Sequence, residues 1–275
     1  MFLYGNGKTI DGGGHVGIEN SMGGTLELKN VSMQNFTELA IWNRGSYLSI
    51  DGGDFTSNSS TYGSAIYNGG IITEIISNFS GNRASNQGGA IYNGWQEEIN
   101  KITGDFINNS AQMGGAIYNE GSVAIIAENG KNIIFEGNTA SKKENGGAIY
   151  SHENGAVHLL AAQGHSIEFK TDSDSIFNSS TELHIGQGGG NYHSASNYYT
   201  GKVILRDVYG SGWILVDSGA LELRGNVNQG KIWLYDSNSS LIISEDGILN
   251  APVTNQVGTV YISDGVIRSS IDGGG

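Results

Sequence analysis

One tetrapeptide, Ala-Ile-Tyr-Asn, recurs along this chain at a nearly constant interval. Copies begin at Ala65, Ala90 and Ala116, and variants begin at Ala40 (Ala-Ile-Trp-Asn) and Ala148 (Ala-Ile-Tyr-Ser). Successive alanines are separated by 25, 25, 26 and 32 residues. A period of this length indicates a solenoid, in which each repeat packs only against its two neighbours.

A second motif, Phe-x-x-Asn, alternates with the first, and three of the Ala-Ile copies follow a pair of glycines. The Phe and Asn residues are Phe55 and Asn58, Phe79 and Asn82, Phe106 and Asn109, and Phe135 and Asn138. The glycine pairs are Gly88 and Gly89, Gly114 and Gly115, and Gly146 and Gly147. Because two independent motifs share one period, equivalent residues are expected to stack on one another.

Each repeat contains three short β-prone pieces separated by Gly, Asn and Ser turns. In the second repeat these pieces are residues 65–68, 71–76 and 78–79. The Leu-x-x-Leu-x-Leu pattern of leucine-rich repeats is absent. The sequence therefore predicts an all-β fold, a right-handed parallel β-helix with three strands per coil. Coils would stack about 4.8 Å apart, as neighbouring strands do in any sheet.

The stacking assigns a role to each motif position. We expect the Phe residues to form a column inside the core and the Asn residues to form a ladder of amide hydrogen bonds. The glycine pairs are expected at corners where a Cβ would clash. Alternation along a strand places the Ile of Ala-Ile-Tyr-Asn inside and the Tyr outside. Four Asn-Gly pairs are expected to provide positive φ at corners: Asn68-Gly69, Asn93-Gly94, Asn129-Gly130 and Asn154-Gly155.

We expect a single β-helix over residues 1–275, with the motifs confined to 36–151. Residues 152–275 keep the texture of short strands and turns and are interpreted as degenerate coils, for example at 202–205 and 231–235. Residues 186–200 have no apolar periodicity, which predicts a protruding loop.

The outward aromatic positions form a predicted file along the rod, and this file is the candidate binding surface. It consists of Trp42, Tyr67, Tyr92, Tyr118 and Tyr150, and the predicted loop adds Tyr192, Tyr198 and Tyr199. One interpretation of the file is packing between coils, since aromatic columns stabilise stacked strands. The other is an amphipathic strip that binds a glycan or a protein.

The amino-acid composition excludes several classes of partner and site. The chain has 14 Lys and Arg against 27 Asp and Glu, a net charge of −13, which disfavours nucleic acid and anionic membranes as partners. It has no Cys and no apolar run long enough for a membrane span. No catalytic residue, cofactor site or metal site is predicted. Asp172-Ser173-Asp174 is interpreted as a solvated turn, and His152, His158 and His165 as surface residues.

The Gly-Gly-Ala-Ile and Phe-x-x-Asn motifs resemble those of the chlamydial polymorphic membrane proteins, a family of autotransporters. The resemblance at the level of motifs covers residues 36–151, and the absence of Cys departs from the family's usual pattern. It implies a passenger on the bacterial surface, exported through the outer membrane, that adheres to host cells or surfaces. It also implies a C-terminal barrel anchor outside this sequence and, given the missing Cys, a source in another Gram-negative group.

Three functions follow as hypotheses. The first is an adhesin-type passenger whose solenoid face binds a host-cell or surface receptor, either protein or glycan. The second is a polysaccharide-processing β-helix such as a lyase, glycosidase or tailspike, for which clustered Asp and Arg in a groove would be the signature. The third is self-association between cells through two rods packed face to face.

Overall fold

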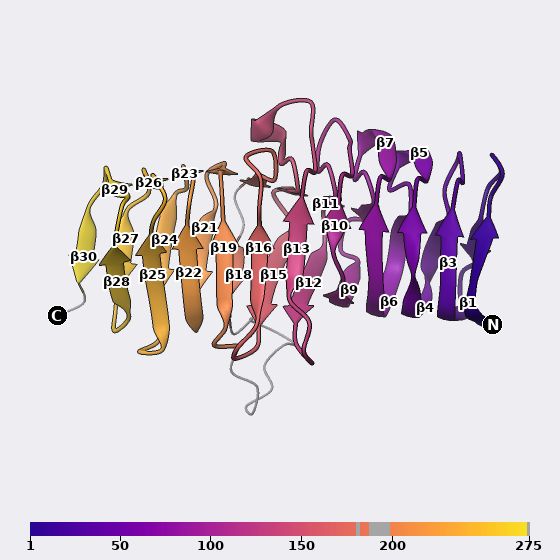
Figure 1. Ribbon diagram of the computed structural model, residues 1–275, viewed down its shortest axis with the longest axis horizontal. Coiled ribbons are helices and arrows are strands. Elements are labelled where there is room, and N and C mark those ends of the chain that lie inside the picture. The colour runs from indigo at the N-terminus through magenta and orange to yellow at the C-terminus, as the bar shows by residue number, and fades with distance from the viewer. Residues whose placement is uncertain (180–181, 187–198, 274–275) are drawn as a thin grey trace.

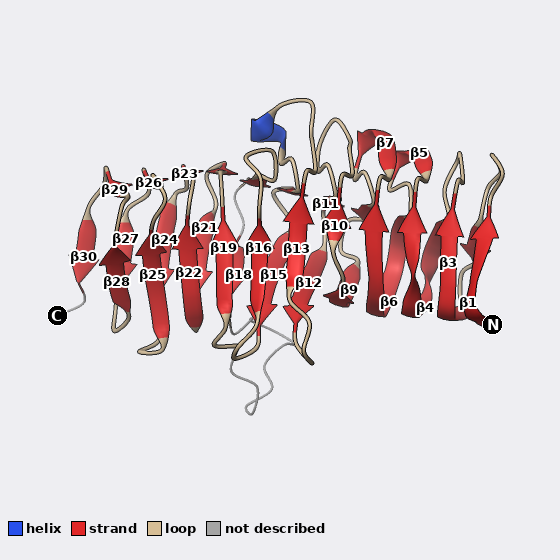
Figure 2. Ribbon diagram, viewed as in Figure 1, coloured by secondary structure: helices blue, strands red, loops and turns tan. Residues whose placement is uncertain are grey.

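The computed structural model describes residues 1–179, 182–186 and 199–273. Its strands lie side by side along one long axis, with the two termini at opposite ends (Figure 1). The secondary structure is almost entirely β, and the only helix in the described ranges is a short 3-10 turn, η1 (Lys143–Asn145) (Figure 2). No helix in these ranges is long and apolar enough to span a membrane.

All strand pairs along the rod are parallel and join residues about one repeat apart, which defines a parallel β-helix with three faces. The first face comprises β2 (Ile18–Asn20), the start of β4 (Ile41–Thr56), the start of β6 (Ile66–Ser80), β8 (Ile91–Asn93), β11 (Ile117–Asn119), β14 (Ile149–Ser151), β17 (Ile176–Asn178), β20 (Val208–Tyr209), β23 (Asn226–Val227), β26 (Ile248–Leu249) and β29 (Val266–Ile267).

The second face comprises the starts of β1 (Phe2–Asp11) and β3 (Thr25–Gln34), the middle of β4 and β6, β9 (Glu98–Thr103), β12 (Ser122–Ala127), β15 (Ala156–Ala161), β18 (Glu182–Ile185), β21 (Trp213–Val216), β24 (Lys231–Leu234), β27 (Val253–Asn255) and β30 (Ile271–Gly273). The third face comprises the ends of β1, β3, β4 and β6, then β10 (Phe106–Ile107), β13 (Ile133–Glu136), β16 (Ser166–Phe169), β19 (Lys202–Leu205), β22 (Gly219–Leu223), β25 (Ser239–Ile243) and β28 (Thr259–Ile262).

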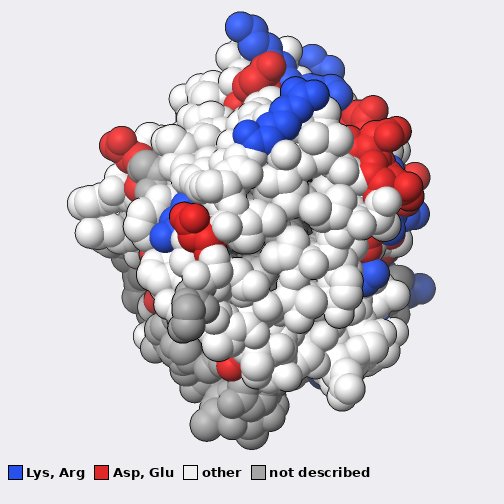
Figure 3. Space-filling model, turned by 90° about the vertical axis from the view of Figure 1, so that its left-hand side faces the viewer, with Lys and Arg blue, Asp and Glu red and all other residues white. Residues whose placement is uncertain are grey.

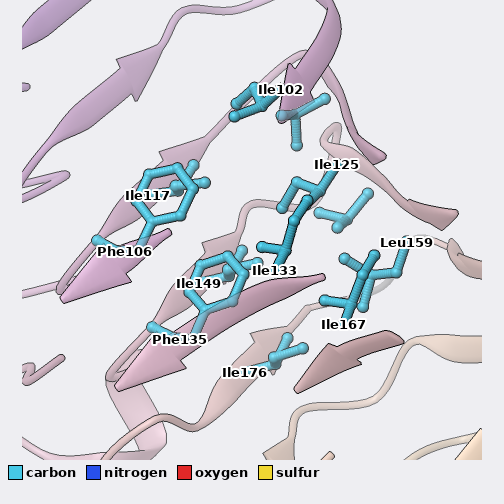
Figure 4. Close-up of a cluster of buried hydrophobic side chains, with 14 of the residues drawn as sticks. Ile102, Phe106, Ile117, Ile125, Ile133, Phe135, Ile149, Leu159, Ile167 and Ile176 are labelled. Carbon is cyan, nitrogen blue, oxygen red and sulfur yellow. The ribbon is translucent and has the colours of Figure 1, made fainter. Parts of the chain in front are cut away.

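The predicted Phe column fills one side of the core. Phe79 and Phe106 are fully buried, stack with ring centroids 5.0 Å apart, and lie in register on adjacent strands. Figure 4 shows Phe106 and Phe135 one above the other, with the Ile residues of the first face beside them. The column also includes Phe169, although this residue has no Asn three positions later. Its ring centroid lies 4.4 Å from that of Phe135. The interior is thus built of vertical columns of like side chains, as the repeat predicts.

The Asn of Phe-x-x-Asn forms the predicted ladder. Each side-chain amide donates to the Oδ1 atom of the Asn on the next coil at 3.0 Å. The ladder runs in this way through Asn58, Asn82, Asn109 and Asn138. The ladder ends on Asp174, which accepts from Asn138 at 2.9 Å and is fully buried. The interpretation of Asp174 as part of a solvated turn is therefore wrong: this carboxylate replaces the next amide and accepts backbone N–H groups as well.

A second ladder corrects the prediction for the Asn-Gly pairs. Asn68 and Asn93 do not turn corners; they are buried on the first face, and their amides donate to the next Asn of the ladder at 2.8 Å. Asn154 also lacks a positive φ, and only Asn129-Gly130, with φ of 55° and 81°, behaves as predicted. A buried amide must find hydrogen-bond partners, and the ladder supplies them.

The glycine pairs lie at corners. The first glycine of each pair has positive φ, 62° at Gly114, a conformation that favours glycine. The second lies under the backbone of the next coil: a Cβ on Gly115 would be 2.0 Å from the carbonyl oxygen of Gly147. Both glycines are therefore required by the close approach of successive coils.

The degenerate coils after residue 152 continue the same three faces, and the strands expected at 202–205 and 231–235 form within a residue of their predicted bounds. Of the predicted loop at 186–200, residues 187–198 lie outside the described residues. Between the third and first faces, β5 (Ser59–Tyr62) and β7 (Arg83–Gln87) form a separate parallel pair that projects from the rod (Figure 1). No sequence motif predicts this projection, which shapes the candidate site.

Candidate binding surface

The predicted aromatic file forms on the outer side of the first face. Trp42, Tyr67, Tyr92, Tyr118 and Tyr150 occupy equivalent positions on adjacent strands, each directly after a buried Ile. The file continues to Phe177 and Tyr209, which sequence reasoning missed because neither follows an Ala-Ile dipeptide. The described part of the file thus runs along most of the first face.

The rings stack on one another and do not lie flat against solvent. Centroids are 4.8 Å apart between Tyr67 and Tyr92 and 5.4 Å between Tyr92 and Tyr118, and the ring planes are within 16° of parallel. Tyr118 retains only 3% of its accessible surface, whereas Trp42, at the N-terminal end of the file, retains 40%. Packing between coils therefore accounts for the middle of the file, and its N-terminal end is open.

A carboxylate fixes the middle of the file. Glu120 accepts the hydroxyl of Tyr92 at 2.7 Å and the hydroxyl of Tyr118 at 3.3 Å. Burial raises the pKa of both tyrosines, and the adjacent carboxylate raises it further because it disfavours a phenolate beside it. These hydroxyls remain protonated near neutral pH and act as hydrogen-bond donors.

The β5–β7 pair covers the file from one side, and we call it the shelf. The ring of Tyr62 on β5 meets Tyr92 edge-on, with centroids 5.8 Å apart and an interplanar angle of 73°. The side-chain amide of Asn86 donates to the Tyr62 hydroxyl at 3.2 Å. Isolated bridges continue the shelf to Ser110 and Thr139 on the following coils.

A groove of about 840 Å³ lies between the shelf and the open end of the file. Its floor includes Trp42 and Tyr67, and its walls are formed by 16–19, 37–39, β5, and Arg83 and Ser85 of β7. The volume is typical of a site for a small molecule or a short chain segment. We call it the N-terminal groove. The repeat pattern predicts Trp42 and Tyr67 as part of the candidate surface, but it does not predict the residues that form the walls of the groove.

The remaining predicted binding residues do not extend this surface. Tyr192 and Tyr198 lie outside the described residues. Tyr199 lies elsewhere, on the outer side of the second face, where it packs against Ala124, Ile126 and Leu160. A smaller recess of about 370 Å³ lies beside Glu120 and includes Trp95, an exposed residue that the repeat pattern did not single out.

Several ion pairs join charged side chains of different coils, among them Lys202 with Glu222. Glu222 accepts from Lys202 at 2.8 Å and from Arg224 at 2.6 Å, and although burial opposes ionisation, these bonds lower its pKa to about 2. A permanently ionised carboxylate cannot donate a proton as a general acid.

Toward the C-terminal end, charged residues gather along the margins of the molecule and leave a broad surface without charge (Figure 3).

Two histidines, His158 and His184, are buried, and the expectation that His158 is a surface residue is therefore wrong. His158 and His184 occupy equivalent positions on β15 and β18, and their rings stack 4.7 Å apart. His184 also lies 3.0 Å from Asp217 and 3.1 Å from Glu182. No group of three or more His, Cys, Asp or Glu side chains in the described ranges could hold a metal ion.

These features define the class of protein: a parallel β-helix of stacked repeats with an aromatic outer face. Three segments, residues 76–94, 104–120 and 132–152, match the model of the Chlamydia polymorphic membrane protein repeat. These three segments are therefore similar to the repeat of this family, as the motifs indicated, and they coincide with coils that carry the Phe column and the glycine pairs. Neither the curated proteins nor the solved structures compared with the chain give a match.

Proposed function

We propose that this chain is a surface-exposed passenger segment that attaches a bacterium to host cells or surfaces. The repeat family supports a location at the outer membrane or cell surface, because its name is that of a membrane protein. A rod of stacked coils holds its outer residues in fixed register and so presents a long, rigid surface to a partner.

The observation that carries the proposal is a pair of exposed aromatic residues, Trp42 at the open end of the file and Tyr62 on the shelf. Trp42 and Tyr62 keep about two fifths of their surface exposed, 40% and 39%, beside a groove that also contains hydroxyl and charged groups. Exposed aromatic residues in a concave setting are typical of the centre of a binding interface. The partner is a protein or glycan receptor on the target surface, and export through the outer membrane belongs to the same proposal.

Attachment of protein-coated beads to cultured epithelial cells tests this proposal. The double variant Trp42→Ser, Tyr62→Ser should reduce attachment about tenfold or more, since aromatic anchors commonly contribute more than 1 kcal/mol each. Tyr47→Ser is the matched control, because Tyr47 is 54% exposed and does not line the groove. Attachment that is lost equally in both variants, or in neither, would contradict a role for the open end of the file.

A further inference from the structure

The shelf has an empty position at its N-terminal side. Each shelf segment follows the Asn of a Phe-x-x-Asn motif: β5 follows Asn58 and β7 follows Asn82. On the preceding coil only residues 37–39 separate Phe36 from Ala40, and no strand forms there. The N-terminal groove occupies the space where that coil would carry a shelf strand, because its walls are residues 37–39 on one side and β5 on the other.

The edge of β5 that faces this space is open. The shelf is a two-stranded sheet, so β5 pairs with β7 on one side and with no strand of the described chain on the other. The backbone N–H of Ser59 donates to the carbonyl of Phe36 at 2.7 Å and closes only the start of this edge. Ser60 pairs with Ala84 of β7, and since N–H groups alternate along a strand, the N–H of Thr61 points toward the groove. A free strand edge is a template for another strand.

The floor of the groove suits an extended chain better than a stacked sugar ring. The guanidinium of Arg44 lies 4.6 Å above the ring of Trp42, and Tyr92 stacks on Tyr67. One face of each ring is therefore already in contact, which leaves less ring surface for a stacked sugar. Four residues of β5 provide about 13 Å of strand for pairing.

Charge narrows the choice of partner. Three charged side chains line the groove: Glu19, Glu38 and Arg83. Glu19 forms an ion pair with Arg44 at 3.0 Å, and no ion pair of Arg83 occurs in the described ranges. Although Glu38 also lines the groove, an arginine without a carboxylate partner favours an acidic residue at the position of the ligand next to it.

We propose that the N-terminal groove binds an extended segment of a partner polypeptide, which adds as a strand to the open edge of β5. Main-chain hydrogen bonds to β5 provide affinity, and alternate side chains contact Trp42 and Tyr67. An acidic residue of the segment pairs with Arg83. This inference names the partner chemistry of the attachment function proposed above and depends on that function for its biological role.

The test begins with a random dodecapeptide library on phage, selected against the whole purified chain. We expect enriched peptides to alternate apolar with polar residues and to contain Asp or Glu. Binding of the synthetic selected peptide is then measured by fluorescence anisotropy. Thr61→Pro removes the N–H that would donate to the added strand and should weaken binding at least tenfold, whereas Thr61→Ala should change it less than about twofold. Selection against Arg83→Glu should enrich Lys or Arg instead.

Hydrogen exchange provides a readout that needs no variant. Bound peptide should slow exchange of the backbone N–H groups of residues 59–62 in the wild-type chain, and far-UV circular dichroism establishes that Thr61→Pro is folded. Failure to select any peptide, exchange at 59–62 that does not slow, or equal binding by Thr61→Pro and Thr61→Ala would overturn strand addition. If beads still attach through Trp42 and Tyr62 in that case, strand addition fails while the attachment function stands.

Discussion

Asn82 donates its side-chain amide to the Oδ1 atom of Asn109, one coil further on, at 3.0 Å, and both side chains are fully buried. The same Oδ1 atom accepts the backbone N–H of Asn82, also at 3.0 Å, and the amide of Asn109 donates to the carbonyl of Phe79. One side chain therefore satisfies polar groups on two coils. The ladder holds neighbouring coils in register at a corner where the strands themselves have ended.

Replacing Asn109 tests how much this ladder stabilises the fold. Asn109→Ala leaves buried donors of Asn82 without an acceptor, so we expect a loss of at least about 2 kcal/mol in the free energy of unfolding. Chemical denaturation followed by circular dichroism measures it. The control is Asn250→Ala, which breaks an exposed amide pair with Asn228 of similar length, 2.8 Å, and should cost less than about 0.5 kcal/mol. Equal losses would show that burial of the ladder is unimportant.

Gly115 tests the close approach of coils at the corner. A Cβ there would meet the carbonyl oxygen of Gly147 at 2.0 Å, so Gly115→Ala should destabilise the chain by about 3 kcal/mol or more, measured as a fall in the urea midpoint. At Gly69 the nearest such atom, the carbonyl oxygen of Asn43, is 3.3 Å away. Gly69→Ala should therefore be much milder, and a reversed order would contradict the corner geometry.

The buried His158 predicts a loss of stability in mild acid. Burial, and then the neighbouring His184, lower the pKa of His158 to about 3, well below the 6.5 of an exposed histidine. The unfolded chain therefore binds a proton that the folded chain does not. Stability is complete above pH 6.5 and falls as the pH drops toward 3, by about 2 kcal/mol between pH 6.5 and 5.

His158→Phe keeps a ring against His184 but cannot titrate. Urea midpoints at pH 7.5 and pH 5 should differ less for this variant than for the wild type. An identical pH dependence of the two proteins would mean that His158 does not provide the acid-sensitive contribution.

The sequence predicted the columns because the period of the repeat equals one turn of the solenoid. The contact between Phe79 and Phe106 could be predicted from spacing alone, because the same residue type recurs at the interval of one coil. The same criterion could have found the His158–His184 stack, whose spacing of 26 residues equals the repeat, but a lone pair of histidines carries no motif.

The prediction for the Asn-Gly pairs was wrong because asparagine is common both in turns and in buried amide ladders. Asn-Gly is a turn signal, yet Asn68 and Asn93 are ladder residues, because an amide that tolerates positive φ also stacks well inside a coil. The shelf was missed for a different reason. Its strands consist of polar residues with no apolar alternation, such as Ser59-Ser60-Thr61, and they form only because the coils beneath bring them side by side. The groove depends on that arrangement and could not be read from composition.

The register of adjacent coils is the central claim, and engineered disulfides test it directly because the chain has no Cys of its own. Ser80 and Ile107 are register partners on β6 and β10, and Glu136 is the partner of Ile107 on the next coil. The double variant Ser80→Cys, Ile107→Cys should form an intramolecular disulfide on mild oxidation. Ser80→Cys with Glu136→Cys should not, because two coil spacings, about 9.6 Å, exceed the reach of a disulfide. Cross-linking of the second pair but not the first would contradict the account.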